Sequence, residues 1–240
     1  MQRILIDREG NKFFVSDANR DYHCQFGIFK ANDFKKKSGV IKTNTGKEFY
    51  MFEPTFIDLY NRKKRSAQIV LKKDIGLILA ETGVNKESVV VDAGGGSGAL
   101  TCALANITKE VVSYEIKPEF VKTIEHNISL LGLTNITVKN KSVGLISEKN
   151  VDLITLDMLN PEKVLTKCAK SLKAGGFLVA YMPSVTQVCV FVKAVNKNDS
   201  LIYMKTVELM EREWKIDGKI ARPEFRMLGH TGFLVFVRRV

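Results

Sequence analysis

Several features that would assign this chain to a special class are missing from its 240 residues. No apolar run is long enough to cross a membrane, and the first residues do not have the layout of a signal peptide. The four cysteines are scattered without a CxxC pair, which argues against a zinc site and against a secreted disulfide framework. We therefore expect a cytoplasmic globular protein that holds no metal and meets no membrane.

What the sequence does contain is a strand that runs into a glycine-rich turn. Three consecutive valines, Val89–Val91, predict a strand that is buried on both faces of a parallel sheet. Asp92 follows, and then Gly94, Gly96 and Gly98 stand at alternate positions before an apolar helical run. Glycines at such a turn let the main chain bend sharply and let a ligand lie against bare backbone.

A second acid closes the next strand. Val111–Tyr114 is the expected strand, and Glu115 comes directly after it. An acid at this place in a βαβ unit hydrogen-bonds the ribose hydroxyls of an adenosine. The unit is therefore expected to bind a cofactor that contains a nucleoside.

The glycine pattern leaves the choice of cofactor open. Gly94-x-Gly96-x-x-Ala99 also satisfies a loose dinucleotide pattern, so NAD is a competitor, and an ordinary glycine turn without a ligand is a third interpretation. Asp92 favours S-adenosylmethionine, because an acid before the turn would repel a pyrophosphate but could accept a hydrogen bond from an ammonium group.

Basic residues outnumber acidic ones, and the excess is uneven. The net charge is +11, and residues 1–73 hold 16 Lys and Arg against 8 Asp and Glu, whereas the rest of the chain holds 21 against 18. Two basic runs, 35–37 and 62–65, lie in this first part. Either run alone is as easily a solvated loop. Together, beside a cofactor domain, they favour a polyanionic substrate, with nucleic acid as the leading candidate.

The pattern of elements divides the chain in two. Residues 1–60 carry short alternating runs split by turn signals and predict a small N-terminal β domain. Residues 61–240 alternate between strand and helix patterns, which predicts a mostly parallel sheet with helices on both faces. We expect residues 202–214 to be largely strand. Ligands of such sheets bind at the carboxyl ends of the strands, where Gly94, Glu115 and Asp157 would meet.

Longer motifs make the assignment more specific. They are Arg65–Asp74, Gly96–Thr101, Ser113–Glu115, Leu156-Asp157, Leu178–Val188, Arg212–Trp214 and Arg222–Val235. With them, nearly the whole chain resembles the tRNA adenine-58 N1-methyltransferase family. The resemblance implies a Rossmann-like class I methyltransferase fold, with a seven-stranded sheet whose last strand is antiparallel, S-adenosylmethionine as cofactor and the tRNA T-loop as substrate. It also implies a homotetramer, with the N-terminal domain contacting tRNA or another subunit.

The resemblance also implies the site residues. Asp157 is the expected catalytic residue: adenine N1 needs no base, only orientation and compensation of the charge that forms on the ring. A solvated acid that caps the next helix is the alternative for Asp157. The residues expected around the cofactor are Gln68, Asp92, Gly94, Gly96, Ser97, Gly98, Ala99, Leu100, Glu115, Ser142 and Asp157. Those expected to contact tRNA are Tyr181, Trp214, His230, Lys35, Lys36, Lys37, Arg62 and Arg65.

Other interpretations exist for single residues and for the whole chain. Core packing is favoured over base stacking for Tyr181 and Trp214 taken singly, and a structural hydrogen bond is favoured over a base role for His230. Gly95 and Ser142 depart from the family pattern, as does the 158–162 segment, which lacks the usual tryptophan or second proline. A methyltransferase for another substrate, such as protein isoaspartate or a small molecule, and a non-catalytic RNA-binding subunit are the competing functions.

Overall fold

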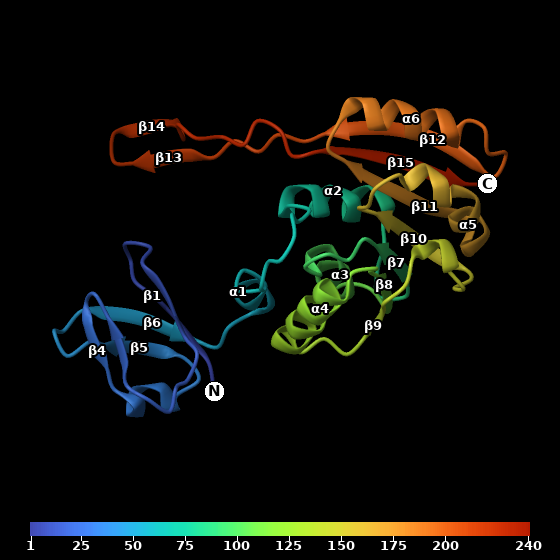
Figure 1. Cartoon of the computed structure of the whole chain (residues 1–240). Helices are drawn as coiled ribbons and strands as arrows, with labels where there is room; N and C mark the ends of the chain where they lie inside the picture. Colours follow the sequence, from blue (N-terminus) through green and yellow to red (C-terminus); the bar gives the residue numbers. More distant parts are fainter. The chain divides into compact units, whose positions relative to one another are not determined.

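The computed structural model describes residues 1–240, which fold into two compact units, residues 1–63 and 64–240. Figure 1 shows the helices and strands of both units, and each unit has its own hydrophobic core. No helix in either unit is long and apolar enough to cross a membrane.

The first unit is built from short antiparallel strands. Strands β1 (Arg3–Ile6), β2 (Lys12–Val15), β5 (Gly39–Lys42) and β6 (Glu48–Phe52) form a sheet in the order β2-β1-β6-β5, and β3 (Tyr22–Cys24) pairs with β4 (Gly27–Phe29). The 3-10 helix η1 (Ala31–Lys35) and helix α1 (Phe56–Tyr60) complete the unit. Its core is aromatic, because Phe29, Phe34 and Phe49 are almost completely buried together.

The second unit is a seven-stranded sheet. Its strands are β7 (Val89–Ala93), β8 (Glu110–Tyr114), β9 (Ile136–Lys139), β10 (Val151–Leu156), β11 (Leu172–Met182), β12 (Leu201–Glu208) and β15 (Phe233–Arg239). The order is β12-β15-β11-β10-β7-β8-β9, and β15 is antiparallel to both of its neighbours while the ladders from β9 to β11 are parallel. The predicted mostly parallel sheet with an antiparallel last strand is confirmed.

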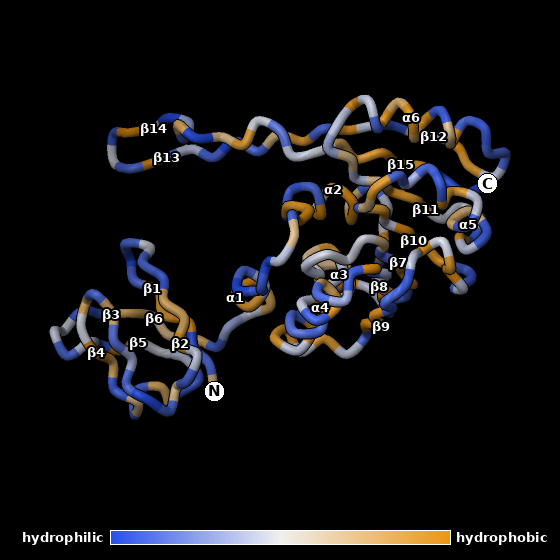
Figure 2. Tube along the Cα trace, viewed as in Figure 1, coloured by the Kyte–Doolittle hydropathy of each residue, from blue (hydrophilic) through white to orange (hydrophobic).

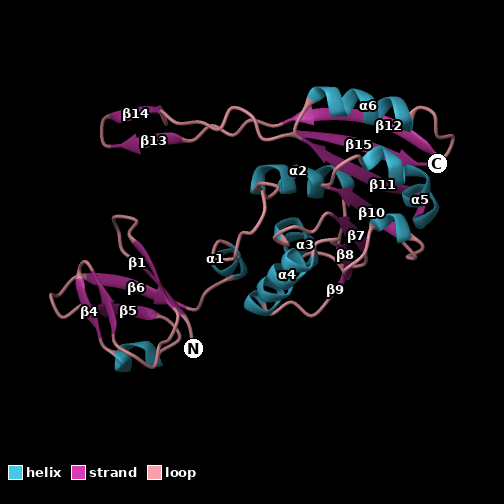
Figure 3. Ribbon diagram, viewed as in Figure 1, coloured by secondary structure: helices cyan, strands magenta, loops and turns pink.

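Helices cover both faces of this sheet (Figure 3). Helices α2 (Lys72–Thr82), α3 (Ala99–Ala105) and α4 (Pro118–Leu131) lie on one face, and α5 (Leu165–Ser171) and α6 (Val185–Val195) lie on the other. Two 3-10 helices, η2 (Val143–Leu145) and η3 (Pro161–Val164), occur in the loops at the carboxyl edge. Successive strand residues alternate between the faces. Val91 therefore packs toward α5 and α6, where Cys168 and Phe191 lie, and Asp92 points to the opposite face. Hydrophobic colours predominate along β10 and β11 in Figure 2.

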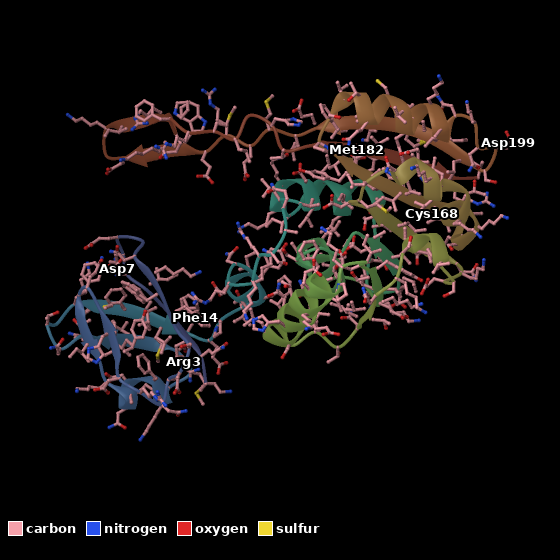
Figure 4. All side chains as sticks on the ribbon, viewed as in Figure 1. Arg3, Asp7, Phe14, Cys168, Met182 and Asp199 are labelled. Carbon is pink, nitrogen blue, oxygen red and sulfur yellow. The ribbon has the colours of Figure 1, made fainter.

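Residues 202–208 are strand, as predicted, but one long segment then leaves the sheet. Strand β12 ends at Glu208, and residues 209–232 form an arm that carries the hairpin of β13 (Trp214–Asp217) and β14 (Ile220–Pro223) (Figure 1). The arm leaves and rejoins the sheet beside Met182, the last residue of β11, which pairs with Phe233 (Figure 4). Residues 209–213 are not strand, and Trp214 begins β13, which pairs with β14 and not with β15.

Candidate active site

The glycine turn after β7 has the geometry that its residues allow. Gly94, Gly96 and Gly98 have φ angles of 86°, 53° and 72°, in the left-handed region that favours glycine. Gly94 also lies directly against the next loop, because a Cβ atom there would fall 1.9 Å from the main-chain oxygen of Asp157. Gly95 has an ordinary φ, but a Cβ there would lie 2.5 Å from Ser113 Oγ. Gly94 and Gly95 therefore let the loop approach its neighbours more closely than a side chain would permit.

A cavity of about 370 Å³ opens at the carboxyl edge of the sheet, beside this turn. Six of the predicted cofactor residues line it: Gln68, Gly94, Gly96, Glu115, Ser142 and Asp157. The other wall residues are Ala67, Ala93, Tyr114, Ile116, Lys117, Phe120, Lys141, Val143, Met158 and Leu159. Ser97, Gly98, Ala99, Leu100 and Asp92, which were also predicted, are not among the residues that line it.

Glu115 is held in the cavity wall by main-chain groups. The Gly96 N–H donates to Oε2 at 2.8 Å, and the Lys117 N–H donates to Oε1 at 2.9 Å. Asn140 Nδ2 donates to the main-chain oxygen of Glu115 at 2.8 Å. Each carboxylate oxygen has a further lone pair, so the group can still accept two hydrogen bonds from a ligand in the cavity.

Asp92 does not line the cavity, and its expected contact with the cofactor, directly or through water, stays a prediction. Its Oδ2 accepts from the Thr101 hydroxyl at 2.5 Å and its Oδ1 accepts from the Thr155 hydroxyl at 2.6 Å. Only 1% of the residue is exposed. Burial raises the pKa of Asp92, and the two hydroxyl donors oppose that shift. It therefore acts on the cavity through its charge and through the two threonines that it fixes.

Ser97 and Asn127 fix the segment that forms another wall of the cavity. The N–H groups of Ser66 and Ala67 donate to Ser97 Oγ at 2.9 Å and 3.0 Å. Asn127 is fully buried, and its side chain exchanges hydrogen bonds with both main-chain groups of Lys64 and donates to the Ser97 oxygen. Asn127 was not predicted as a site residue, because it belongs to no motif and is a single polar residue among the buried positions of α4.

Ser142 lies on the cavity wall at the start of η2. Its Oγ accepts from the Gly144 N–H at 3.1 Å and so caps that short helix. Only one donor occupies the oxygen, and the hydroxyl proton is available to a ligand.

Asp157 presents a carboxyl group to the cavity without a protein partner. Its main-chain N–H donates to the Ala93 oxygen at 2.9 Å, and no group of the chain hydrogen-bonds or pairs with its side chain. Burial, and then the charges of Asp92 and Glu115, raise the pKa of Asp157 to about 7. Three carboxyl groups in one region make this site attractive to a cation and unattractive to a pyrophosphate.

The sequence family of the chain follows from comparison with known proteins. Residues 50–222 match the family model described as tRNA methyltransferase complex GCD14 subunit. A tRNA (adenine(57)-N(1)/adenine(58)-N(1))-methyltransferase TrmI of Methanocaldococcus jannaschii is 33% identical over 98% of this chain and 94% of that protein. The chain belongs to the GCD14 family.

Solved structures agree with this membership. A SAM-dependent O-methyltransferase from Thermotoga maritima superposes with a TM-score of 0.87 and 30% identity over 100% of this chain and 92% of the other. The tRNA (m1A58) methyltransferase TrmI from Aquifex aeolicus gives a TM-score of 0.82 and 25% identity over 100% and 97%. The chain is thus a methyltransferase of the GCD14 family with a Rossmann-like sheet.

The residues that were expected to contact tRNA are divided between the two units of this GCD14 family member. Lys35, Lys36 and Lys37 are exposed at the end of η1 in the first unit. The basic run at 62–65 is divided: the Arg62 guanidinium lies 4.2 Å from the centre of the Phe14 ring in the first unit (Phe14 is labelled in Figure 4), and Arg65 is exposed in the second. Between them, Lys63 is buried, and the main-chain N–H of Lys64 donates a hydrogen bond to Asn127.

The three carboxy-terminal candidates lie in different environments. Tyr181 is 9% exposed, which fits the packing interpretation, whereas Trp214 is 58% exposed on the arm, so core packing was wrong for it. His230 pairs with Glu208 at 2.6 Å through Nδ1 and with the Pro183 oxygen at 2.8 Å through Nε2. Hydrogen bonding to Glu208, and then to Pro183, raises the His230 pKa. The structural hydrogen bonds that were favoured for His230 are present.

The remaining polar clusters do not form a second centre. No group of three or more His, Cys, Asp and Glu side chains is arranged to hold a metal ion. None of the four cysteines forms a disulfide within the chain. Cys102 and Cys168 are buried, as the sequence suggested, but Cys24 is half-buried and Cys189 is exposed.

Proposed function

We propose that this chain transfers the methyl group of S-adenosylmethionine to N1 of adenine 58 in the T-loop of tRNA. The observation that carries the proposal is the unpartnered Asp157 carboxyl, which faces the same cavity as Glu115 in a chain of the GCD14 family. The related proteins from Methanocaldococcus jannaschii and Aquifex aeolicus are named for this reaction, and the first name also includes adenine 57.

The cavity residues fit S-adenosylmethionine better than NAD. The bare main chain at Gly94 and Gly96 lets an elongated ligand approach closely, and Glu115 keeps two acceptor positions for the ribose hydroxyls. Ser142 lies on the same wall, within the loops that an adenine ring would meet. The acidic surroundings of Asp157 favour a sulfonium and an ammonium group over phosphates. The bound cofactor supplies a methyl group that its sulfonium centre already activates.

In this proposal Asp157 and the walls of the cavity orient the target adenine. An adenine placed against the cavity needs no base, because N1 carries its own lone pair. An ionised Asp157 accepts a hydrogen bond from the exocyclic amine, orients the ring in line with the methyl group and compensates the charge that forms on it. Asn127 and Ser97 hold the 64–67 segment, so Ala67 and Gln68 keep water from part of the site.

Two further parts of the chain serve the tRNA and the assembly in this proposal. Adenine 58 must be extruded to reach the cavity, and the exposed lysines at 35–37 with Arg62 and Arg65 hold the tRNA backbone. The arm exposes large apolar side chains, including Trp214, Ile216 at 71% and Phe225 at 85%. Such a surface is expected to be buried against other copies in a homotetramer, and native mass spectrometry of the parent and of Phe225→Ser tests this.

A hydroxyl acceptor is the second candidate, because the Thermotoga maritima structure is described as an O-methyltransferase. Methylation of a hydroxyl needs a base, and a carboxyl with a pKa of about 7 has the strength for that task. The position of the methyl group on the product distinguishes the two reactions.

The test is methylation of an unmodified tRNA transcript with labelled cofactor, followed by mapping of the modified nucleotide. We expect N1-methyladenosine at position 58, and no label at that position in a transcript with guanosine there. Transcripts that keep adenine at only one of positions 57 and 58 report whether both are used. Label in a ribose or in a small-molecule hydroxyl would replace this proposal with O-methylation, and cofactor binding without transfer would indicate a non-catalytic subunit.

A further inference from the structure

The segment between β9 and β10 forms one wall of the cavity without an α-helix in it. Residues 140–150 contain only the short 3-10 helix η2, and Lys141, Ser142 and Val143 line the cavity. The main-chain hydrogen bonds of the segment are local, each joining residues two or three positions apart. Other contacts must therefore fix the position of this wall relative to the sheet.

Apolar packing holds the middle of the segment. Val143 is buried in the core of the second unit, and Ile146 packs against the same core. Apolar contacts are non-directional, whereas a hydrogen bond requires a particular distance and angle. The packing therefore keeps the segment on the sheet, and polar contacts decide its register there.

Glu148 supplies such polar contacts near the end of the segment. Its Oε2 accepts from the Tyr114 hydroxyl at 2.7 Å and from the Ser147 N–H at 3.1 Å, and its Oε1 pairs with the Lys139 ammonium. Lys139 Nζ also donates to Tyr114 Oη and to Ser147 Oγ, each at 3.4 Å. Tyr114 ends β8 and Lys139 ends β9, so one carboxylate joins the segment to the carboxyl ends of two strands.

Tyr114 continues this link to the glycine turn. Its main-chain oxygen accepts from the N–H groups of Gly94 and Gly95 at 2.9 Å and 3.2 Å, and the residue lines the cavity. Tyr114 is buried, and a buried hydroxyl needs a hydrogen-bond partner, which here is Glu148. Tyr114 thus connects the glycine turn with the segment that carries Ser142.

We propose that Glu148 is a positioning residue for cofactor binding, which holds the Ser142 wall of the cavity in register through Tyr114 and Lys139. This inference rests on the part of the proposed function that places S-adenosylmethionine in the cavity, with its adenine beside Ser142. Both carboxylate oxygens of Glu148 face donors. An amide in its place would turn an N–H either toward Lys139 or toward Tyr114 and Ser147, so glutamine cannot keep all of these contacts.

Calorimetry with S-adenosylmethionine and with S-adenosylhomocysteine tests this role without tRNA. We expect Glu148→Gln to weaken both ligands about tenfold, the effect of roughly one hydrogen bond, because they share the adenosine that meets the Ser142 wall. Tyr114→Phe removes one hydroxyl only and should weaken both about threefold. It also keeps the test decisive if Glu148→Gln does not fold.

Two further measurements separate positioning from a general effect on the fold. In tRNA methylation the loss should appear as a higher KM for the cofactor and not as a lower kcat, since the wall serves the ground state and the transition state alike. Hydrogen exchange of the ligand-free protein should become faster in residues 141–147 of Glu148→Gln and stay parental in the central strands.

Glu81→Gln is the matched control. Glu81 pairs with Lys205 at 2.6 Å in the same unit and does not line the cavity, so removal of its charge should leave both affinities unaltered. Parental affinities in Glu148→Gln and Tyr114→Phe, equal losses in Glu81→Gln, or a loss confined to kcat would overturn the positioning role. Failure of the proposed function is distinct: a parent that binds the cofactor but methylates no tRNA overturns only the substrate assignment, and one that binds neither ligand overturns both proposals.

Discussion

A Cβ atom on Gly94 would lie 1.9 Å from the main-chain oxygen of Asp157. The glycine turn after β7 therefore packs directly against the loop after β10, and only a residue without a side chain permits this close contact. This contact brings the Asp157 carboxyl to the wall that the glycines form.

Gly94→Ala should consequently damage the site as well as the fold. The substitution adds a clash with main chain to the strain of a φ of 86°, so we expect a loss of about 3 kcal/mol or more of unfolding free energy. Gly132→Ala is the control, because Gly132 has a φ of 64° and open space around its Cβ position. It should cost only about 1 kcal/mol. Urea unfolding measures both, and equal losses would show that the loops can move apart.

Glu115→Ala should weaken S-adenosylmethionine binding. A carboxylate that accepts from two hydroxyls contributes about 1.5–3 kcal/mol for each charged hydrogen bond, so a loss of at least tenfold in affinity is expected. Glu115 also holds the Gly96 and Lys117 N–H groups, and Glu115→Gln keeps an acceptor for part of this arrangement. Calorimetry should order the affinities as parent, Gln and Ala. Unchanged affinity, or tighter binding of NAD, would contradict the cofactor assignment.

Asp157→Asn should separate catalysis from binding. The amide keeps the shape but loses the charge that orients the adenine amine and compensates the cationic ring. Loss of one preorganised electrostatic contact costs on the order of 10²–10³ in rate. Affinities for cofactor and tRNA should change much less, because the contribution is greatest in the transition state. Single-turnover methylation under saturating conditions checks this, and a near-parental rate would show that the Asp157 charge does not contribute to methyl transfer.

The same carboxyl should give a pH-dependent stability. In the folded ligand-free chain Asp157 keeps its proton up to a pKa of about 7, whereas the unfolded chain releases it near the ordinary value of 3.8. The folded state therefore binds more protons in this range, and the contribution of Asp157 to the free energy of unfolding decreases as the pH rises between these two values. Asp157→Asn lacks this term, so its stability relative to the parent should increase from about pH 5 to about pH 8 in urea unfolding.

Cofactor binding offers a control for that titration. A cation in the cavity favours the ionised carboxyl, so the affinity for S-adenosylmethionine should rise with pH through about 7. S-adenosylhomocysteine, which lacks the sulfonium charge, should show a flatter dependence. Identical pH profiles for the two ligands would place Asp157 outside the reach of the sulfur centre.

The lysines of the first unit should govern the salt dependence of tRNA binding. Replacement of Lys35, Lys36 and Lys37 by alanine should reduce the slope of log affinity against log salt by roughly two to three, with cofactor binding unchanged. The comparison variant replaces three exposed lysines of the second unit, Lys163, Lys167 and Lys170. If the first triple variant keeps the parental slope, the run is a solvated loop, and Arg62 and Arg65 become the next candidates.

The local sequence pattern was sufficient to predict the glycine turn after β7 and the edge of the sheet where the cavity lies. Consecutive valines, alternate glycines and an acid after each of two strands predict the β7 turn and the meeting of Glu115 with Asp157, because parallel strands end at one edge. The antiparallel last strand followed from family motifs and not from periodicity.

Tertiary structure decided where the polar groups go. Asp92 accepts from Thr101 and Thr155, the second of which is 63 positions away along the chain, and this pairing withdraws it from the cavity. Asn127 gained its role only because α4 packs beside the segment at Lys64. A hydrogen bond depends on the relative position of segments that no local period encodes.

The dependence on distant segments also explains two differences between prediction and structure, at the basic run 62–65 and at Trp214. The basic run at 62–65 is continuous in sequence, but the boundary between the two units lies within it. Its first two residues therefore belong to the first unit and its last two to the second. The alternating pattern around Trp214 is that of a strand, and it is one, but its partner is β14 and not the sheet. Sequence determined that these residues are extended or charged; the choice of partner was made by packing between distant parts of the chain.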